Sequence, residues 1–256
     1  MNQAKVLNFF GLLLIMFGIS FAIPLFVAIF YGESLIRVFG LGMSILVLVG
    51  FLSWFFTKDN KQELSLSDGF VITVLFWIVL SVSGSIPFIL FGFGVVDSFF
   101  ESMSGITTTG ATVIAGLDDL PKSLLIYRQL LQWLGGMGLI VLAIAVMPLL
   151  GIGGGQLFKT QTPGPMSEQR LTPRITSTAR ALWSIYFVLT VLCIFAYRLA
   201  GMSYFDAVSH AFSTVSIGGF STHDLSIGFF DSLSIEIVCI TFMLLSAMSF
   251  AVHYSA

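Results

Sequence analysis

Charged residues are scarce in this chain. Only 9% of its 256 residues are Asp, Glu, Lys or Arg, whereas 57% are hydrophobic, and the mean hydropathy is +1.00. Soluble domains carry roughly a quarter charged residues, so these values exclude a water-exposed globule. The formal net charge of −2 gives no electrostatic reason to expect a nucleic-acid partner.

Cysteines and catalytic patterns are equally scarce. The two cysteines, Cys193 and Cys239, each lie inside an apolar run, which favours packing over a disulfide or a metal pair. The three histidines, at 210, 223 and 253, do not have a metal-ligand spacing, and we expect them to be structural. No pattern of nucleophile, base or paired carboxylates indicates an enzyme, and no cofactor is expected.

Long apolar runs dominate what is present. A membrane-spanning helix needs about 20 residues, and six stretches are long enough: roughly 6–31, 35–57, 69–95, 124–150, 179–199 and 232–256. The first run is too long for a signal peptide and has no small-residue cleavage site, so it is interpreted as a spanning helix. The sequence therefore predicts an all-α membrane protein.

Two joints between these runs are neither loops nor spans. Residues 97–122 and 203–231 each begin with a segment that fits one short helix and continue with Gly, Thr, Ser and small apolar residues. Non-helical backbone at membrane depth is tolerated only where protein buries it or where it lines a watery cavity. Both joints are therefore predicted to be re-entrant segments.

An internal repeat relates these two segments. A shift of 109 residues aligns them without a gap, so that Asp97 meets Asp206 and Gly110 meets Gly219. Each copy has a span before it and a span after it, and both run in the same direction. We expect a transmembrane hairpin at 1–62, a first pore repeat at 63–158 with its filter near 107–112, and a cytoplasmic loop with the second pore repeat at 159–256, with its filter near 216–221.

The basic residues predict the orientation, because cytoplasmic loops are enriched in Lys and Arg. The side that contains the N-terminus holds seven of the eleven: Lys5, Lys58, Lys61, Lys159, Arg170, Arg174 and Arg180. That side is predicted to be cytoplasmic. The opposite side holds most of the acidic residues, which would attract cations to an entrance or would simply be solvated loop charges. Arg128 and Arg198 lie near outer helix ends and are expected to extend to the interface.

The glycine-containing loops suit a cation filter. A dehydrated potassium ion needs oxygen dipoles in place of water, and potassium channels supply backbone carbonyls. Glycine accepts the positive φ that such a backbone requires. The predicted potassium ligands are the backbone carbonyls of Thr107, Thr108, Thr109, Gly110, Ser216, Ile217, Gly218 and Gly219. Alternatively, the glycines at 110 and 219 serve close helix packing or simple turns.

Four motifs resemble one family, the Trk/Ktr-type (TrkH-like) potassium-uptake membrane subunits. They are ESMSGITTTGATV at 101–113, YRQLLQWLGGMG at 127–138, GIGGGQLF at 151–158 with TPGP at 162–165, and SIGGFSTHD at 216–224. The resemblance implies potassium conduction through a pore of four fused hairpins in the bacterial inner membrane. It also implies a homodimer and a cytoplasmic nucleotide-binding regulatory subunit (TrkA-like).

The sequence departs from that family in one large respect, because it holds two hairpins instead of four. A truncated chain, the N-terminal half of such a subunit, is favoured over two copies that close one ring. A non-conducting assembly subunit remains the alternative function. A carrier with discontinuous helices is disfavoured, because it predicts inverted repeats. One glycine in place of Gly-Tyr-Gly predicts weaker selectivity than in potassium channels.

Overall fold

The fold is all-α, as predicted. The computed structural model describes residues 3–58, 66–146 and 175–248, and all regular structure in these ranges is helical. The helices are α1 (Gln3–Ser20), α2 (Ala22–Tyr31), α3 (Ile36–Thr57), α4 (Leu66–Phe91), α5 (Val95–Ile106), α6 (Lys122–Val146), α8 (Ile175–Leu199), α9 (Tyr204–Val215) and α10 (Leu233–Ala247), with 3-10 turns η1 (Leu117–Asp119) and η3 (Ser226–Phe230).

Helix length and hydrophobicity identify a membrane protein. Four helical stretches in the described ranges are long and apolar enough to span a bilayer: Gln3–Tyr31, Ile36–Thr57, Asp68–Phe91 and Ala181–Leu199. Helix α6 is not among them, and it carries Arg128, Gln129 and Gln132 in its N-terminal half. Helix α10 is described over only 15 residues. The ends of the two remaining predicted spans, 147–150 and 249–256, lie outside the described residues.

Two predicted spans differ from the observed helices. The run predicted as one helix over 6–31 is interrupted at Phe21, one turn before Pro24. Proline has no N–H to donate, so it weakens the helical bonding at this point. The span predicted at 69–95 ends at Phe91, because Gly92 adopts φ +118. Helix α5 then begins at Val95, two residues before the short helix predicted from Asp97.

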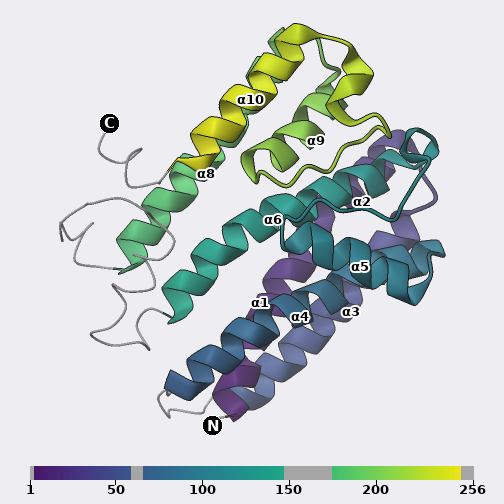
Figure 1. The fold of residues 1–256 in the computed structure, drawn as a ribbon. Helices are drawn as coiled ribbons and strands as arrows, with labels where there is room; N and C mark the ends of the chain where they lie inside the picture. Colours follow the sequence, from purple (N-terminus) through teal and green to yellow (C-terminus); the bar gives the residue numbers. More distant parts are fainter. Residues whose placement is uncertain (1–2, 59–65, 147–174, 249–256) are drawn as a thin grey trace, which may run out of the picture.

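Helix α6 occupies the middle of the molecule. Figure 1 shows it between a group made of α1, α3, α4 and α5 and a group made of α8, α9 and α10. The buried hydrophobic residues form two clusters, one over α1 to α6 and one over α6 to α10. Leu124 and Leu131 of α6 belong to the first cluster and Met137 to the second. Each half of the molecule therefore packs against this helix.

The first two spans pack closely as a hairpin. A Cβ atom on Gly50 of α3 would lie 2.7 Å from the backbone oxygen of Gly11 in α1, so the two backbones nearly touch at these glycines. Such close approach through small residues is characteristic of helix pairs in membranes. The hairpin lies beside α4 and α2, away from the predicted filter loops (Figure 1).

Candidate functional site

The two predicted filter segments have the same backbone conformation. Thr108 and Ile217 both have φ +55, and Gly110 and Gly219 have φ +76 and +84. Each pair is 109 residues apart. The capping hydrogen bonds also correspond: the 109 N–H donates to Ser104 O at 2.9 Å, and the 218 N–H donates to Ser213 O at 2.8 Å. The sequence offset is therefore reproduced in three dimensions.

This conformation differs from that of an extended strand. In an extended strand, neighbouring carbonyls point to opposite sides. Here Thr109 and its counterpart Gly218, whose φ is not positive, each lie between two residues with positive φ. Positive φ is strained for the β-branched Thr108 and Ile217, at about 1–3 kcal/mol each. The surrounding hydrogen bonds hold both in place: Thr108 N–H donates to Gly105 O, and Ile217 N–H donates to Thr214 O.

The predicted ligand carbonyls are almost all free of hydrogen bonds. Of the eight, the Gly218 carbonyl accepts a bond from Gln132 Nε2 at 2.7 Å. The other seven, at 107–110, 216, 217 and 219, accept none from any residue that the structure describes. Thr109, Ile217 and Gly219 are exposed and Thr107, Thr108 and Gly110 are half-buried, so these oxygens are accessible ligands that a cation could use.

The two segments lie against each other. A Cβ atom on Gly110 would overlap the Gly218 carbonyl oxygen, so only glycine fits this contact. Gly135 of α6 is equally close to the Ile106 carbonyl at the end of α5. The two loops thus converge beside α6.

A buried ion pair supports the first segment. Glu101 and Arg128 are both fully buried, and Arg128 Nε donates to Glu101 Oε1 at 2.8 Å. Thr112 donates its hydroxyl to the same carboxylate at 2.9 Å. The guanidinium also donates to Ser221 O at 2.9 Å and lies 4.4 Å from the Phe220 ring centre. The expectation that Arg128 extends to the interface is wrong, because its counter-charge and acceptors are inside.

Histidine replaces the acid in the second repeat. His210 occupies the position of Glu101 after the 109-residue shift, is buried, and lies 2.9 Å from the Ser221 hydroxyl through Nε2. Ser221 in turn occupies the position of Thr112. The same pair of positions therefore connects the short helix to the loop in both repeats, with a charged group in one and an imidazole in the other.

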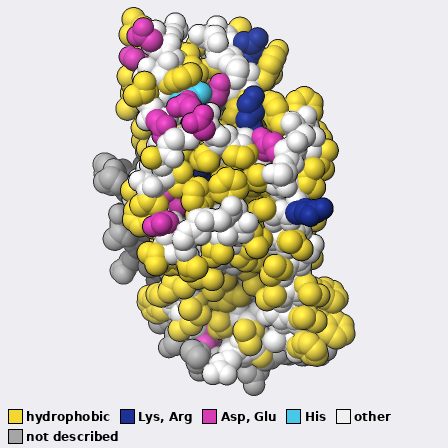
Figure 2. Space-filling model, turned by 90° about the vertical axis from the view of Figure 1, so that its right-hand side faces the viewer, with side chains coloured by type: hydrophobic (Ala, Val, Ile, Leu, Met, Phe, Trp, Pro, Cys, Tyr) yellow, Lys and Arg dark blue, Asp and Glu magenta, His cyan; other side chains and the backbone are white. Residues whose placement is uncertain are grey.

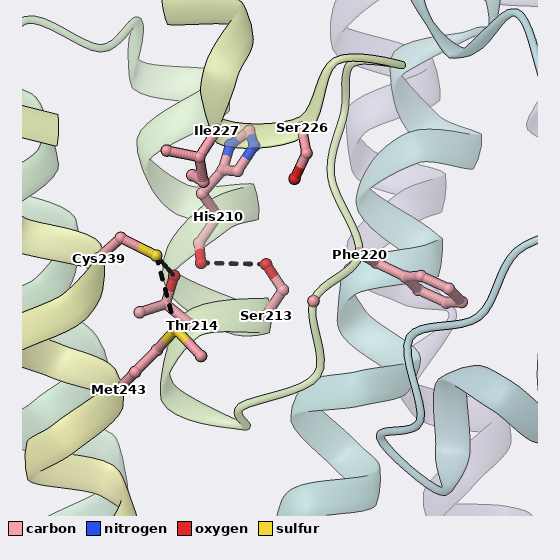
Figure 3. Close-up of a pocket in the computed structure, with 9 residues that line it drawn as sticks. His210, Ser213, Thr214, Phe220, Ser226, Ile227, Cys239 and Met243 are labelled. Atoms are coloured by element: carbon pink, nitrogen blue, oxygen red, sulfur yellow. Dashed lines mark hydrogen bonds between the residues drawn. The ribbon is translucent and has the colours of Figure 1, made fainter. Parts of the chain in front are cut away.

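A cavity of about 170 Å³ lies behind the second filter segment. Figure 3 shows it between α9, α10 and the loop, and Gly219, Ser213, Thr214 and Met243 are among the residues that line it. Its lining contains thiol, thioether and hydroxyl groups but no charged side chain. Cys239 at its edge and Cys193 are free thiols, as predicted.

The loops beyond the two segments are joined by acidic residues. His223 Nδ1 lies 2.5 Å from Asp118 Oδ1, and Asp224 accepts hydrogen bonds from the N–H groups of Gly116 and Leu117. The hydrogen bond with His223 lowers the pKa of the Asp118 carboxyl from its ordinary value, although desolvation opposes it. Figure 2 shows acidic side chains gathered around a histidine above a broad hydrophobic surface.

Sequence reasoning missed the polar residues of α6. The predicted site consisted of loop residues, whereas Arg128 and Gln132 of α6 donate hydrogen bonds to the second predicted filter loop. A signal was present, because polar side chains four residues apart in an apolar helix mark an inward-facing functional stripe. Arg198, the other arginine predicted to reach the interface, is exposed.

Known proteins resemble the chain over its whole length. It is 50% identical to the Trk system potassium uptake protein TrkH of Halomonas elongata and 46% identical to that of Escherichia coli K12, covering 100% of this chain and 54% and 53% of those proteins. The crystal structure of the potassium transporter TrkH from Vibrio parahaemolyticus matches with a TM-score of 0.86 at 47% identity, over 99% of this chain and 52% of that one.

The chain thus spans about half the length of the relatives that it matches. The family model described as "TrkH: Cation transport protein" matches residues 35–256. The chain therefore belongs to the TrkH family of cation transport proteins.

Proposed function

We propose that this chain contributes two filter segments to a pore through which potassium enters the cell. The observation that carries the proposal is the pair of loops with matching left-handed residues and free carbonyl oxygens. The potassium ligands are the backbone carbonyls of Thr107, Thr108, Thr109, Gly110, Ser216, Ile217, Gly218 and Gly219. Relatives of this chain are named potassium uptake proteins, which favours potassium as the transported ion over other cations.

The electrostatics of the segments favour a cation. Helices α5 and α9 each end directly before a filter segment, and the C-terminal end of a helix carries a partial negative charge. The acidic residues Asp118 and Asp224 lie on the loops beyond, and Asp206 lies in the first turn of α9. A membrane potential of 100 mV, negative inside, supplies about 2.3 kcal/mol per ion, so passive conduction suffices for uptake.

The wider organisation is part of the same proposal. Residues 1–62 form the N-terminal hairpin, residues 63–158 the first pore repeat, and residues 159–256 the loop and the second repeat. The N-terminus and the basic loops lie in the cytoplasm, and the acidic loops face outward across the bacterial inner membrane. The assembled transporter is a homodimer that binds a cytoplasmic nucleotide-binding regulatory subunit (TrkA-like). No catalytic reaction is proposed.

Rubidium uptake tests the proposal. Vesicles would contain the longer protein that includes this chain, either unchanged or with Gly110→Asp and Gly219→Asp together. We expect selective rubidium entry with the unchanged protein and none with the variant, because a carboxylate at either position would obstruct the filter. Equal uptake by both folded proteins would exclude a filter at these loops.

The second candidate function is a non-conducting assembly role. The observation that favours it is the presence of only two filter segments in the described residues, since potassium-channel filters use four. In that case the Gly110→Asp and Gly219→Asp changes would alter assembly with other subunits. The chain would conduct no ions with or without these changes. Pull-down of tagged copies separates the two functions. If the loops form a filter, the variant should still assemble; if the loops serve assembly, it should not.

A further inference from the structure

One side chain of α6 binds the backbone of the second filter at two points. Gln132 Nε2 donates to the Gly218 carbonyl at 2.7 Å, and Gln132 Oε1 accepts from Phe220 N–H at 3.0 Å. The side chain is fully buried, so neither bond competes with water. Together the two bonds fix the peptide groups on either side of Gly219, the glycine that lies in the left-handed region.

The amide also explains why the second filter has two adjacent glycines. A Cβ atom on Gly218 would overlap the carboxamide group of Gln132, so a larger residue there would displace this amide from its two hydrogen bonds. The first filter has Thr109 at the matching position. Among the described residues, no side-chain amide binds the Thr109 carbonyl or the Ala111 N–H. Among the described residues, the glycine at 218 thus accompanies a contact that the first loop, with Thr109 at this position, does not make.

We propose that Gln132 is a positioning residue that sets the direction of the Gly218 carbonyl and thereby the affinity of the second filter for its ion. A carbonyl oxygen has two lone pairs, so it accepts one hydrogen bond from Gln132 and keeps one lone pair for a cation. Without the amide, the peptide between Gly218 and Gly219 is free to rotate, because glycine restricts neither neighbour.

Neighbouring contacts make the arrangement rigid. Four residues earlier in the same helix, Arg128 donates to Ser221 O and contacts the Phe220 ring. The loop from Gly218 to Ser221 is thus held by one face of α6 through three hydrogen bonds. Rigid support of ligand groups by surrounding residues is what keeps a binding site in its productive geometry.

The inference rests on the proposed function, and its test uses the same rubidium assay in the longer protein. Gln132→Leu keeps the side-chain size and removes both bonds. Gln129→Leu is the matched control, because Gln129 lies in the same helix, is fully buried, and its amide atoms have no partner among the described residues. We expect the KM for rubidium to rise about tenfold for Gln132→Leu and to stay unchanged for Gln129→Leu.

A second variant gives a readout that a purely structural role would not move. In Gln132→Glu, a protonated carboxyl can donate to Gly218 O and accept from Phe220 N–H, whereas an ionised carboxylate can only accept. Burial raises the pKa of a carboxyl, so both forms should be reachable between pH 5.5 and pH 8.5. We expect a KM near that of the unchanged protein at pH 5.5 and a KM about tenfold higher at pH 8.5, with no such change in Gln129→Glu.

The outcomes separate the two proposals. If the unchanged protein takes up no rubidium, the proposed function fails before any variant is compared. If the unchanged protein conducts and Gln132→Leu matches it, the inference alone is overturned. If the leucine variant does not accumulate, the pH comparison decides within a single sample of Gln132→Glu: a constant KM overturns the inference, and a pH-dependent one supports it.

Discussion

At the scale of single residues, Gly110 combines two constraints. Its φ is +76, and a Cβ atom would overlap the Gly218 carbonyl oxygen. Gly110→Ala should therefore displace both filter segments, and we expect it to abolish rubidium uptake by the longer protein. Gly116→Ala is the control: its φ is +74, but a Cβ atom there meets nothing within 4 Å.

The comparison separates backbone strain from the steric overlap. Both changes impose the left-handed penalty of about 1–2 kcal/mol on a residue with a side chain, but only the one at 110 moves a filter carbonyl. Thermal unfolding of the two variants would report the shared strain. Uptake lost in both would mean that strain alone impairs the pore.

Arg128 and Glu101 form a charged pair without solvent access. Removing one partner leaves an uncompensated buried charge, which typically costs about 3–5 kcal/mol. We expect Arg128→Met and Glu101→Met each to lower the free energy of unfolding by that amount, and the double variant to recover part of the loss. Chemical or thermal denaturation in detergent would measure it.

The exposed Arg198 provides the comparison for this pair. Arg198 donates a hydrogen bond to Met202 O at 2.9 Å and lies over the Tyr204 ring. Arg198→Met should therefore cost about 1 kcal/mol, well below the loss from the buried pair. Additive losses in the double variant at 101 and 128 would show that the two charges do not depend on each other.

At the scale of helices, the hairpin of α1 and α3 depends on Gly11 and Gly50. Gly50→Val would push a methyl group into the Gly11 backbone, and overpacking of this kind costs about 1–3 kcal/mol. We expect a lower melting temperature with the KM for rubidium unchanged, because the hairpin lies away from the filter loops.

Gly40→Val is the internal control in the same helix, since a Cβ atom at Gly40 meets nothing within 4 Å. It should leave the melting temperature nearly unchanged. A raised KM in the folded Gly50→Val variant would instead connect the hairpin to the filter.

The helices themselves were largely predictable from the sequence, and their ends were not. Apolar runs identify spans because a bilayer demands them. Hydrophobicity continues, however, across Gly92, where the backbone conformation ends one helix, and across Phe21, near which Pro24 lacks an N–H. The glycines at 110 and 219 were found by the repeat. The partner of Arg128 was not, because a sequence indicates depth in the membrane but not which buried neighbour carries the opposite charge.

At the scale of the whole molecule, two filter segments meet side by side. A ring around an ion requires more ligands than one side supplies. We therefore expect the 256-residue chain, purified alone, to take up rubidium only as an assembly of at least two copies. Native mass spectrometry of the vesicle-forming sample would measure the copy number, and uptake by a monomer would contradict the expectation.

Helix α6 has a consequence for how such a protein can change over time. It follows the first filter in the chain, yet Gln132 and Arg128 bind the second. Without α6, the second loop would lose the three hydrogen bonds that Gln132 and Arg128 make to it, so we expect residues 128–132 and 218–221 to vary together among relatives.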